Sequence, residues 1–167
     1  MRPMEPTVLG RLYRLHAPAL LLYARQWGGS ADDIVQEAFL RLAQQVPPPE
    51  QVLPWLYRVV RNEALANHRT ASRRRERERR ASAPEAWFSK TEDRLDAGEA
   101  TRLLAELPLE LREVIVARLW GGLTFEEIAR LVGSSLPTTY RRYQTGLTQL
   151  RERLEGRWTR TPTAPTK

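Results

Sequence analysis

The chain contains no cysteine, and this absence removes several kinds of chemistry at once. Disulfide bonds, thiolate zinc sites and cysteine nucleophiles are excluded, and a reducing compartment is permitted. The two histidines, His16 and His68, show no spacing that indicates a metal site, so we expect neither metal nor cofactor. No glycine-rich phosphate loop is present. These absences argue against an enzyme.

Long apolar runs are missing as well. No segment of the sequence approaches the roughly 20 apolar residues that a membrane-spanning helix needs. The first residues, MRPMEPTVLG, lack the apolar core of a signal peptide. We therefore expect a cytoplasmic protein with no membrane insertion.

Positive charge is abundant and unevenly placed. The 167 residues carry a formal net charge of +7, which favours a polyanionic partner such as nucleic acid. Residues 55–80 hold nine arginines against three glutamates, and residues 134–160 hold six against two. Residues 29–51 are acidic instead. Two basic zones and one acidic zone predict more than one partner surface.

Helical periodicity dominates, and no alternating strand pattern is present. The segment RRRERERRASAP is charged and poor in apolar residues, so it indicates a linker, with a solvated stretch that contacts nothing as the plainer alternative. We expect Pro18 to interrupt the first helical segment. The predicted fold is all-α, with two small helical domains joined by this linker. The predicted boundaries are 1–72, linker 73–94, 95–158, and a disordered Pro/Thr tail at 159–167.

Residues 123–143 have the pattern of two short helices joined by a tight turn. Thr124 is a good N-cap and Glu127 completes a capping box. Gly133 suits the left-handed residue that ends a helix, and Ser135 caps the next one. This is typical of a helix-turn-helix, whose second helix enters the DNA major groove. An ordinary helical hairpin is the alternative.

A helical wheel of residues 30–46 separates two faces. One is an apolar core stripe, with Ile34 at its edge: Val35, Ala38, Phe39, Leu42 and Val46. The opposite face is polar: Asp33, Gln36, Glu37, Leu40 and Gln44. Leu40 is the apolar exception there, either a harmless exposed leucine or the anchor of a protein-docking stripe.

Residues 55–73 form a second two-faced helix on the wheel. The predicted core side holds Trp55, Leu56, Val59, Val60 and Ala66. The other side mixes arginines with rings: Tyr57, Arg58, Arg61, Leu65, His68, Arg69 and Ser72. Such a mixture suits phosphate contact and base stacking, although a merely solvated basic face fits too. Glu63 falls near the apolar side, and the wheel does not explain it.

Several segments resemble a known family. SADDIVQEAFLRL, WLYRVVRNEAL and the basic run after them resemble the N-terminal σ2 domain of bacterial sigma factors. LPLELREVIVARLWGGLTFEEIARLVG and the helix after it resemble the σ4 domain. Two such domains with a short linker are similar to the extracytoplasmic-function (ECF) branch.

The resemblance implies a non-catalytic protein that binds core RNA polymerase and directs it to promoter DNA, with an anti-sigma factor as a candidate third partner. It implies core docking through Asp33, Gln36, Glu37 and Leu40. With the wheel, it implies minus-ten DNA binding through Tyr57, Arg58, Arg61, Asn62, Leu65, His68 and Arg69. It implies minus-thirty-five binding through Ser135, Thr138, Tyr140, Arg141 and Arg142. The loop over residues 44–51 takes the position that captures a flipped base.

The sequence also departs from the family pattern. Ala66 stands where an aspartate is common, and Ser134 and Thr139 replace the usual inward apolar residues of the recognition helix. The triple proline at residues 47–49 is atypical of the base-capture loop. These departures predict a divergent subgroup with its own promoter sequence.

Two other functions stay open at this point. A stand-alone helix-turn-helix regulator would need a dimer interface or an effector domain, and the N-terminal half offers no obvious ligand pocket. A nuclease would need clustered carboxylates for metal, whereas Asp32-Asp33 and Glu126-Glu127 fall in helix first turns, where they favour the helix dipole.

Overall fold

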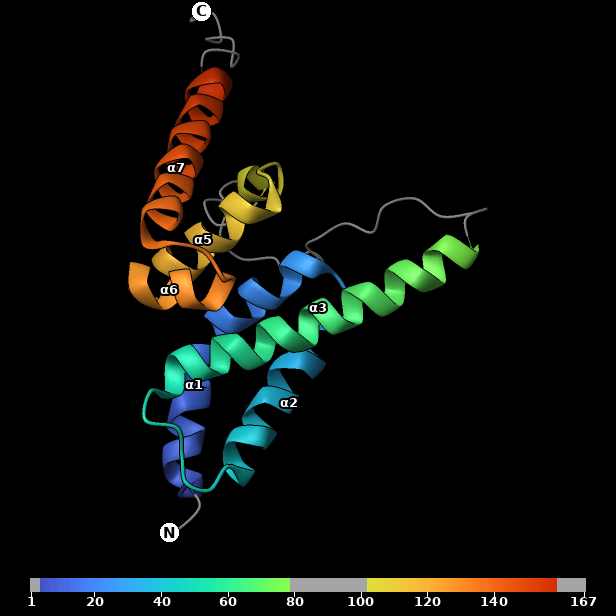
Figure 1. Ribbon diagram of the computed structural model, residues 1–167, viewed down its shortest axis with the longest axis vertical. Coiled ribbons are helices and arrows are strands. Elements are labelled where there is room, and N and C mark those ends of the chain that lie inside the picture. Colours follow the sequence, from blue (N-terminus) through green and yellow to red (C-terminus); the bar gives the residue numbers. More distant parts are fainter. Residues whose placement is uncertain (1–3, 79–101, 159–167) are drawn as a thin grey trace, which may run out of the picture.

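The computed structural model describes residues 4–78 and 102–158, and every regular element within these two ranges is a helix (Figure 1). The first range forms a unit of α1 (Pro6–Ala24), the 3-10 helix η1 (Arg25–Trp27), α2 (Ala31–Gln44) and α3 (Val52–Glu78). The second forms a unit of α5 (Leu109–Leu119), α6 (Phe125–Val132) and α7 (Leu136–Trp158). The predicted all-α fold with two helical units is confirmed.

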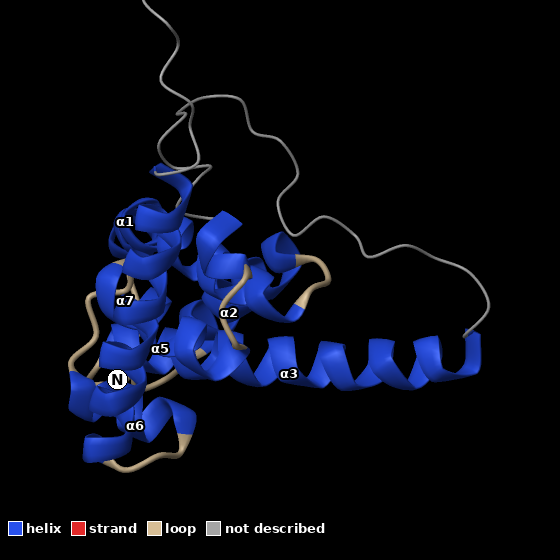
Figure 2. Cartoon of the chain, turned by 90° about the horizontal axis from the view of Figure 1, so that it is seen from above, coloured by secondary structure: helices blue, strands red, loops and turns tan. Residues whose placement is uncertain are grey.

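The predicted boundary at residue 72 falls inside α3, which continues to Glu78. Figure 2 shows this helix projecting well beyond the body of the molecule. The rest of the predicted linker and the predicted tail lie outside the described residues. Within the described ranges, no helix combines the length and the apolarity of a membrane span.

The predicted interruption at Pro18 is wrong, because α1 runs through this proline without a break. Proline removes one intrahelical hydrogen bond, which weakens a helix interior. Here Ala17, Leu20 and Tyr23 are buried on either side of the proline. Their burial against neighbouring helices holds the helix together despite the lost bond.

The core stripe predicted for α2 is confirmed in all but one residue. Val35, Ala38, Phe39 and Leu42 are buried, and Ile34 is buried beside them. Ser30 caps this helix, with its Oγ accepting from the Asp33 amide at 3.4 Å. Val46 is 48% exposed, because the helix ends at Gln44 and the chain beyond it is extended.

The core side predicted for α3 is wrong in two positions. Tyr57 is fully buried with Leu56, Val60 and Ala64, and Ala66 is exposed instead. The wheel assumed that this helix packs on one side only. In the structure α3 contacts α1 and α2 on one side and α6 of the second unit on another, so its buried arc is wider.

Helix α5 is the centre of the second unit. Every residue from Leu111 to Ala117 is buried, because α5 lies between α7 and the first unit. Gly146 of α7 allows the close contact of α5 and α7, since a Cβ there would collide with the side chain of Ile115. The apolar core continues from α1, α2 and α3 into α5 and α6, so the two units pack together around one core.

Candidate functional site

The polar face of α2 is accessible, as predicted. Asp33, Gln36 and Leu40 are exposed and Glu37 is half-buried. Leu40 is 50% exposed, and it lines an open groove of about 400 Å³ between α1 and α2. The groove is lined by apolar groups of both helices, with Pro6, Leu9, Tyr13 and Phe39 among them. This surface offers an apolar anchor beside acidic and amide groups.

The contribution of α1 to this surface was missed in the sequence. Tyr13 is 46% exposed, and its ring meets that of Phe39 edge to face, with centroids 4.9 Å apart. Tyr13 and Phe39 are far apart along the chain, and a wheel of one helix cannot join them. The relevant signal was the pair of apolar residues Leu9 and Tyr13, which lie one helical turn apart.

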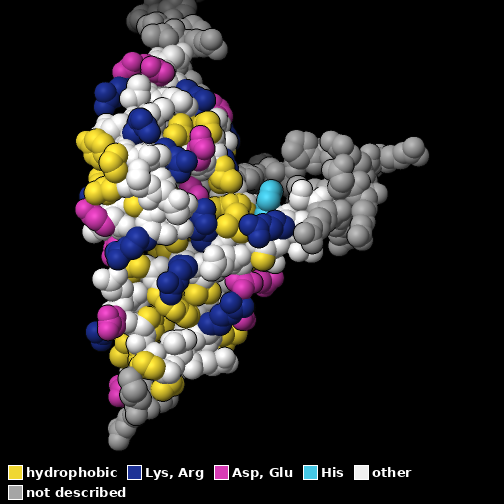
Figure 3. Space-filling model, in the orientation of Figure 1, with side chains coloured by type: hydrophobic (Ala, Val, Ile, Leu, Met, Phe, Trp, Pro, Cys, Tyr) yellow, Lys and Arg dark blue, Asp and Glu magenta, His cyan; other side chains and the backbone are white. Residues whose placement is uncertain are grey.

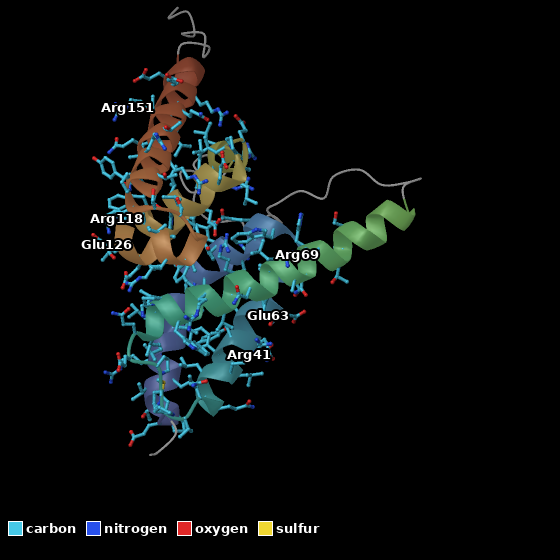
Figure 4. All side chains as sticks on the ribbon, viewed as in Figure 1. Arg41, Glu63, Arg69, Arg118, Glu126 and Arg151 are labelled. Carbon is cyan, nitrogen blue, oxygen red and sulfur yellow. The ribbon has the colours of Figure 1, made fainter. Side chains whose placement is uncertain are left out.

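Arg41 explains the position of Glu63. Its guanidinium contacts Glu37 at 2.8 Å on its own helix and Glu63 at 2.7 Å on α3. Figure 4 shows the Arg41 and Glu63 side chains meeting between the two helices. Because these groups are partly exposed, the pairs contribute little to stability. The pair with Glu63 links α2 to α3, and Arg41 partly neutralises the predicted docking face.

The residues predicted to bind minus-ten DNA divide into three groups along α3. Four are exposed on its outer side: Arg58, Asn62, His68 and Arg69. The Nδ1 of His68 lies 2.9 Å from the carbonyl oxygen of Trp27, which requires Nδ1 to carry the proton. Leu65 is half-buried against the core. Arg61 is partly buried and Tyr57 wholly so.

Tyr57 is a packing residue, and its predicted place on the DNA-binding face is wrong. Its ring meets that of Tyr23 at 4.8 Å, edge to face. A Cβ on Gly121 of the second unit would lie 2.5 Å from the Tyr57 hydroxyl oxygen, so the glycine permits this approach. The hydroxyl is buried without a hydrogen-bond partner among the described residues. Burial raises the pKa of Tyr57.

Arg61 is bound to the second unit. Its Nε lies 2.6 Å from Oε1 of Glu113, and the same oxygen accepts a 2.6 Å hydrogen bond from the Tyr23 hydroxyl. Burial lowers the pKa of Arg61, but the hydrogen bond and charge of Glu113 outweigh it, and the pKa is raised. Burial and then Glu113 raise the pKa of Tyr23 well above its usual range. No pattern in the sequence pairs these three residues.

The helix-turn-helix has the predicted local geometry. Thr124 and Glu127 form the full capping box, with bonds of 3.2 Å and 2.8 Å. Gly133 ends α6 with φ of +67°, a conformation in which glycine avoids the Cβ clash. The Ser135 Oγ then accepts from the Thr138 amide at 3.3 Å and caps α7.

The recognition part of α7 presents polar and aromatic groups. Ser135, Tyr140 and Arg141 are exposed, whereas Thr138 and Arg142 are half-buried. Arg142 lies 3.9 Å from Glu110 of α5, which places it nearer the body of the unit than Arg141. Figure 3 shows Lys and Arg side chains along α7 and α3 on the face in view.

Thr139 occupies the inward position that the sequence assigned to it. It is fully buried, and its hydroxyl donates to the Ser135 carbonyl oxygen at 2.9 Å. Because that bond satisfies the hydroxyl, threonine is tolerated where an apolar residue is usual.

An open cleft of about 380 Å³ separates α6 from the start of α3 and the loop before it. From α3 it is lined by Pro54, Trp55 and Arg58, and from α6 by Glu127, Arg130 and Leu131. Arg58 therefore faces the second unit as well as solvent. Among the described residues, no group of histidine and carboxylate side chains is placed to hold a metal.

This arrangement is that of a helical DNA-binding protein in two units, one of which carries a helix-turn-helix. Two family models match it in the same order: sigma-70 region 2 over residues 12–74 and sigma-70 region 4 over residues 97–150. The chain belongs to the sigma-70 family of RNA polymerase sigma factors, in its ECF branch.

Two curated relatives agree with this assignment. The ECF RNA polymerase sigma factor SigD of Mycobacterium tuberculosis is 32% identical, over 65% of this chain and 55% of SigD. SigE of Mycolicibacterium smegmatis is 31% identical, over 86% of this chain and 60% of SigE. The chain thus spans less than two thirds of the length of these relatives.

Solved structures share the fold. Sigma factor RpoE of Bartonella quintana, in complex with the anti-sigma factor NepR, has a TM-score of 0.74 at 22% identity. The match covers 89% of this chain and 98% of RpoE. CnrH, in complex with the cytosolic domain of CnrY, has a TM-score of 0.64 at 23% identity, over 91% of this chain and 90% of CnrH.

Proposed function

We propose that this protein binds core RNA polymerase and directs it to specific promoters. The α2 face, with Leu40 as its apolar anchor, docks on the polymerase. The exposed residues of α3 bind the minus-ten element, and α7 binds the minus-thirty-five element. The polymerase supplies the catalysis, and the sigma factor acts in the cytoplasm by binding alone.

One observation carries this proposal. The region 2 and region 4 matches coincide with two exposed surfaces of different chemistry. The first is an acidic face with a half-exposed leucine, Leu40, which suits a protein partner. The second carries the exposed Arg141 beside Tyr140 at the start of a capped recognition helix, which suits DNA.

An anti-sigma factor is a further proposed partner. One protein of similar fold, the sigma factor RpoE, was solved in complex with the anti-sigma factor NepR, and another, CnrH, was solved in complex with the cytosolic domain of CnrY. Their likeness to this chain is one of fold, and co-purification with this protein would identify its own partner.

In vitro transcription tests the proposed function. Purified core polymerase is incubated with genomic fragments with and without this protein, and the RNA 5′ ends are sequenced. We expect new start sites that share two upstream elements. Fragment binding by the protein alone, with no new start sites when polymerase is present, would instead indicate a stand-alone regulator.

A further inference from the structure

The exposed face of the recognition helix extends beyond the residues that the sequence assigned to DNA. Between Pro137 and Thr148 the exposed residues of α7 share one side of the helix: Pro137, Tyr140, Arg141, Gln144, Thr145 and Thr148. At about 100° per residue, Arg141 and Gln144 lie near the middle of this side, and Tyr140 lies at its edge. Gln144 therefore takes a central place on the face, although no sequence pattern selected it.

Gln144 is joined to Tyr140, which lies one helical turn earlier. The Gln144 Nε2 donates a hydrogen bond of 2.9 Å to the Tyr140 hydroxyl oxygen. A primary amide has two N–H groups and a carbonyl oxygen that accepts, so this bond uses only part of its capacity. One N–H and Oε1 of Gln144 are left to pair with a ligand.

The Tyr140 ring is in turn held by α6. It meets the ring of Phe125 edge to face, with centroids 5.3 Å apart. Phe125 also meets the ring of Tyr143 at 5.2 Å, and the guanidinium carbon of Arg118 lies 4.9 Å from the Phe125 centroid. Phe125 is thus surrounded on several sides and gives Tyr140 a fixed support.

This support makes Gln144 a pre-positioned side chain on an exposed surface. Phe125 holds the Tyr140 ring, and the Tyr140 hydroxyl holds the Gln144 amide. A side chain that is held before binding loses less conformational entropy when it meets a ligand. An exposed glutamine without such a partner would have to lose that freedom at the moment of binding.

The chemistry of the Gln144 amide matches one base. In the major groove adenine presents N7 as an acceptor and the N6 amino group as a donor, and glutamine pairs with both. The second N–H of Gln144 would donate to N7, and Oε1 would accept from N6. Guanine presents two acceptors in the same groove, so it can use only the donor end of the amide.

The spacing of Gln144 from Arg141 indicates which base pair it meets. The two exposed residues are three positions apart on α7. Helical residues three apart contact successive bases when a helix lies in the major groove, as in C₂H₂ zinc fingers. The base pair for Gln144 would then be the neighbour of the one for Arg141.

We propose that Gln144 recognises an adenine of the minus-thirty-five element, and that Tyr140 and Phe125 are positioning residues for its amide. The inference rests on the proposed function, because it assumes that α7 enters promoter DNA. It adds the base that is selected and the side chains that select it.

Base preference in transcription tests the proposal. Core polymerase and the full-length protein transcribe a mapped promoter that carries each of the four base pairs in turn at every upstream position. We expect the parent protein to favour adenine at one of these positions. Gln144→Ala should reduce this preference roughly 5- to 150-fold, the discrimination of one good bidentate pair. The preferences at other positions should be kept.

Gln149→Ala is the matched control. Gln149 is the same residue type on the same helix, but it is half-buried and lies away from the exposed face. This variant should keep the adenine preference of the parent protein. An equal loss in both variants would show that the preference depends on the helix as a whole, and it would overturn the proposal.

A modified base tests the contact atom by atom. Replacing the selected adenine by 7-deazaadenine removes the N7 acceptor and keeps the N6 amino group. Transcription by the parent protein should fall roughly two- to tenfold, the effect of one hydrogen bond. Transcription by Gln144→Ala should not respond, because this variant has no donor for N7. A parent protein that does not respond overturns the bidentate pairing.

Tyr140→Phe tests the positioning role. It keeps the ring against Phe125 and removes the hydroxyl that holds Gln144. We expect a smaller loss of the same adenine preference than with Gln144→Ala. In the double variant, Tyr140→Phe should add nothing to the loss caused by Gln144→Ala. A loss of preference at a different position would mean that Tyr140 contacts a base itself, which overturns the positioning role.

Two further results decide against the proposal. One is an adenine preference that survives Gln144→Ala, and the other is a parent protein that favours adenine at no upstream position. Failure of the proposed function is a separate result, because the parent protein would then produce no new start sites at all.

Discussion

Leu40→Ala tests the docking face most directly. Full burial of a leucine stabilises by about 1.5–3 kcal/mol, and half of the Leu40 side chain remains exposed in the free protein. Covering the remaining half on polymerase is therefore worth about 0.75–1.5 kcal/mol. The dissociation constant for core polymerase should rise roughly three- to tenfold when this side chain is truncated. Leucine and alanine are both good helix formers, so α2 itself should persist.

Fluorescence anisotropy with labelled protein and core polymerase measures this change, and a thermal melt measures stability. Leu15→Ala is the matched control, because Leu15 is 69% exposed on α1 and does not line the groove beside Leu40. The control should bind like the parent protein. Equal affinities for the parent and Leu40→Ala would refute the docking assignment, and so would an equal loss in both variants.

Four further outcomes are expected. Tyr57→Phe should leave the unfolding free energy unchanged or raise it by up to about 1 kcal/mol, because it removes a buried hydroxyl that has no hydrogen-bond partner among the described residues. A clearly lower unfolding free energy in urea titration would reveal a hydrogen bond to that hydroxyl. Thr124→Ala should lower the unfolding free energy by about 1 kcal/mol, because the capping box is lost. A thermal melt should show this as a lower melting temperature. An unchanged melting temperature would mean that the cap does not stabilise the protein. Arg141→Ala should relax base preference at one upstream position by about 1–3 kcal/mol in transcription from mapped promoter variants. The Arg142 side chain lies near Glu110, and we expect Arg142→Ala to weaken transcription from all promoter variants evenly. It should also reduce the slope of log affinity against log salt by about one. The reverse pattern would make Arg142 the base-reading residue and Arg141 the phosphate-binding one.

The helix ends could be predicted from the sequence because their signals lie within a few residues of each end. The capping box of Thr124 and Glu127, the left-handed Gly133 and the cap at Ser135 each lie within a few residues of the group they satisfy. The exposure of Leu40 could be predicted for the same reason, since α2 packs on one side only.

Predictions failed where a helix is buried on more than one side, or where tertiary packing outweighs a local signal. Tyr57 belongs to the core because α1 and the second unit both approach that side of α3. Pro18 stays within α1 because burial of the residues around it outweighs one lost hydrogen bond. A helical wheel treats one helix by itself, so it shows neither the other helices that pack on it nor the free energy of that packing.

The sequence by itself determined the all-α class, the order of the two units, the helix-turn-helix and the family, because these depend on periodicity, caps and motif spacing. Only the tertiary structure decided which residues of those helices contact one another. It brought Tyr23 and Arg61 to Glu113, although Tyr23 lies 90 residues and Arg61 52 residues before Glu113 in the chain. Contacts of that separation depend on how whole helices pack, and no local pattern encodes them.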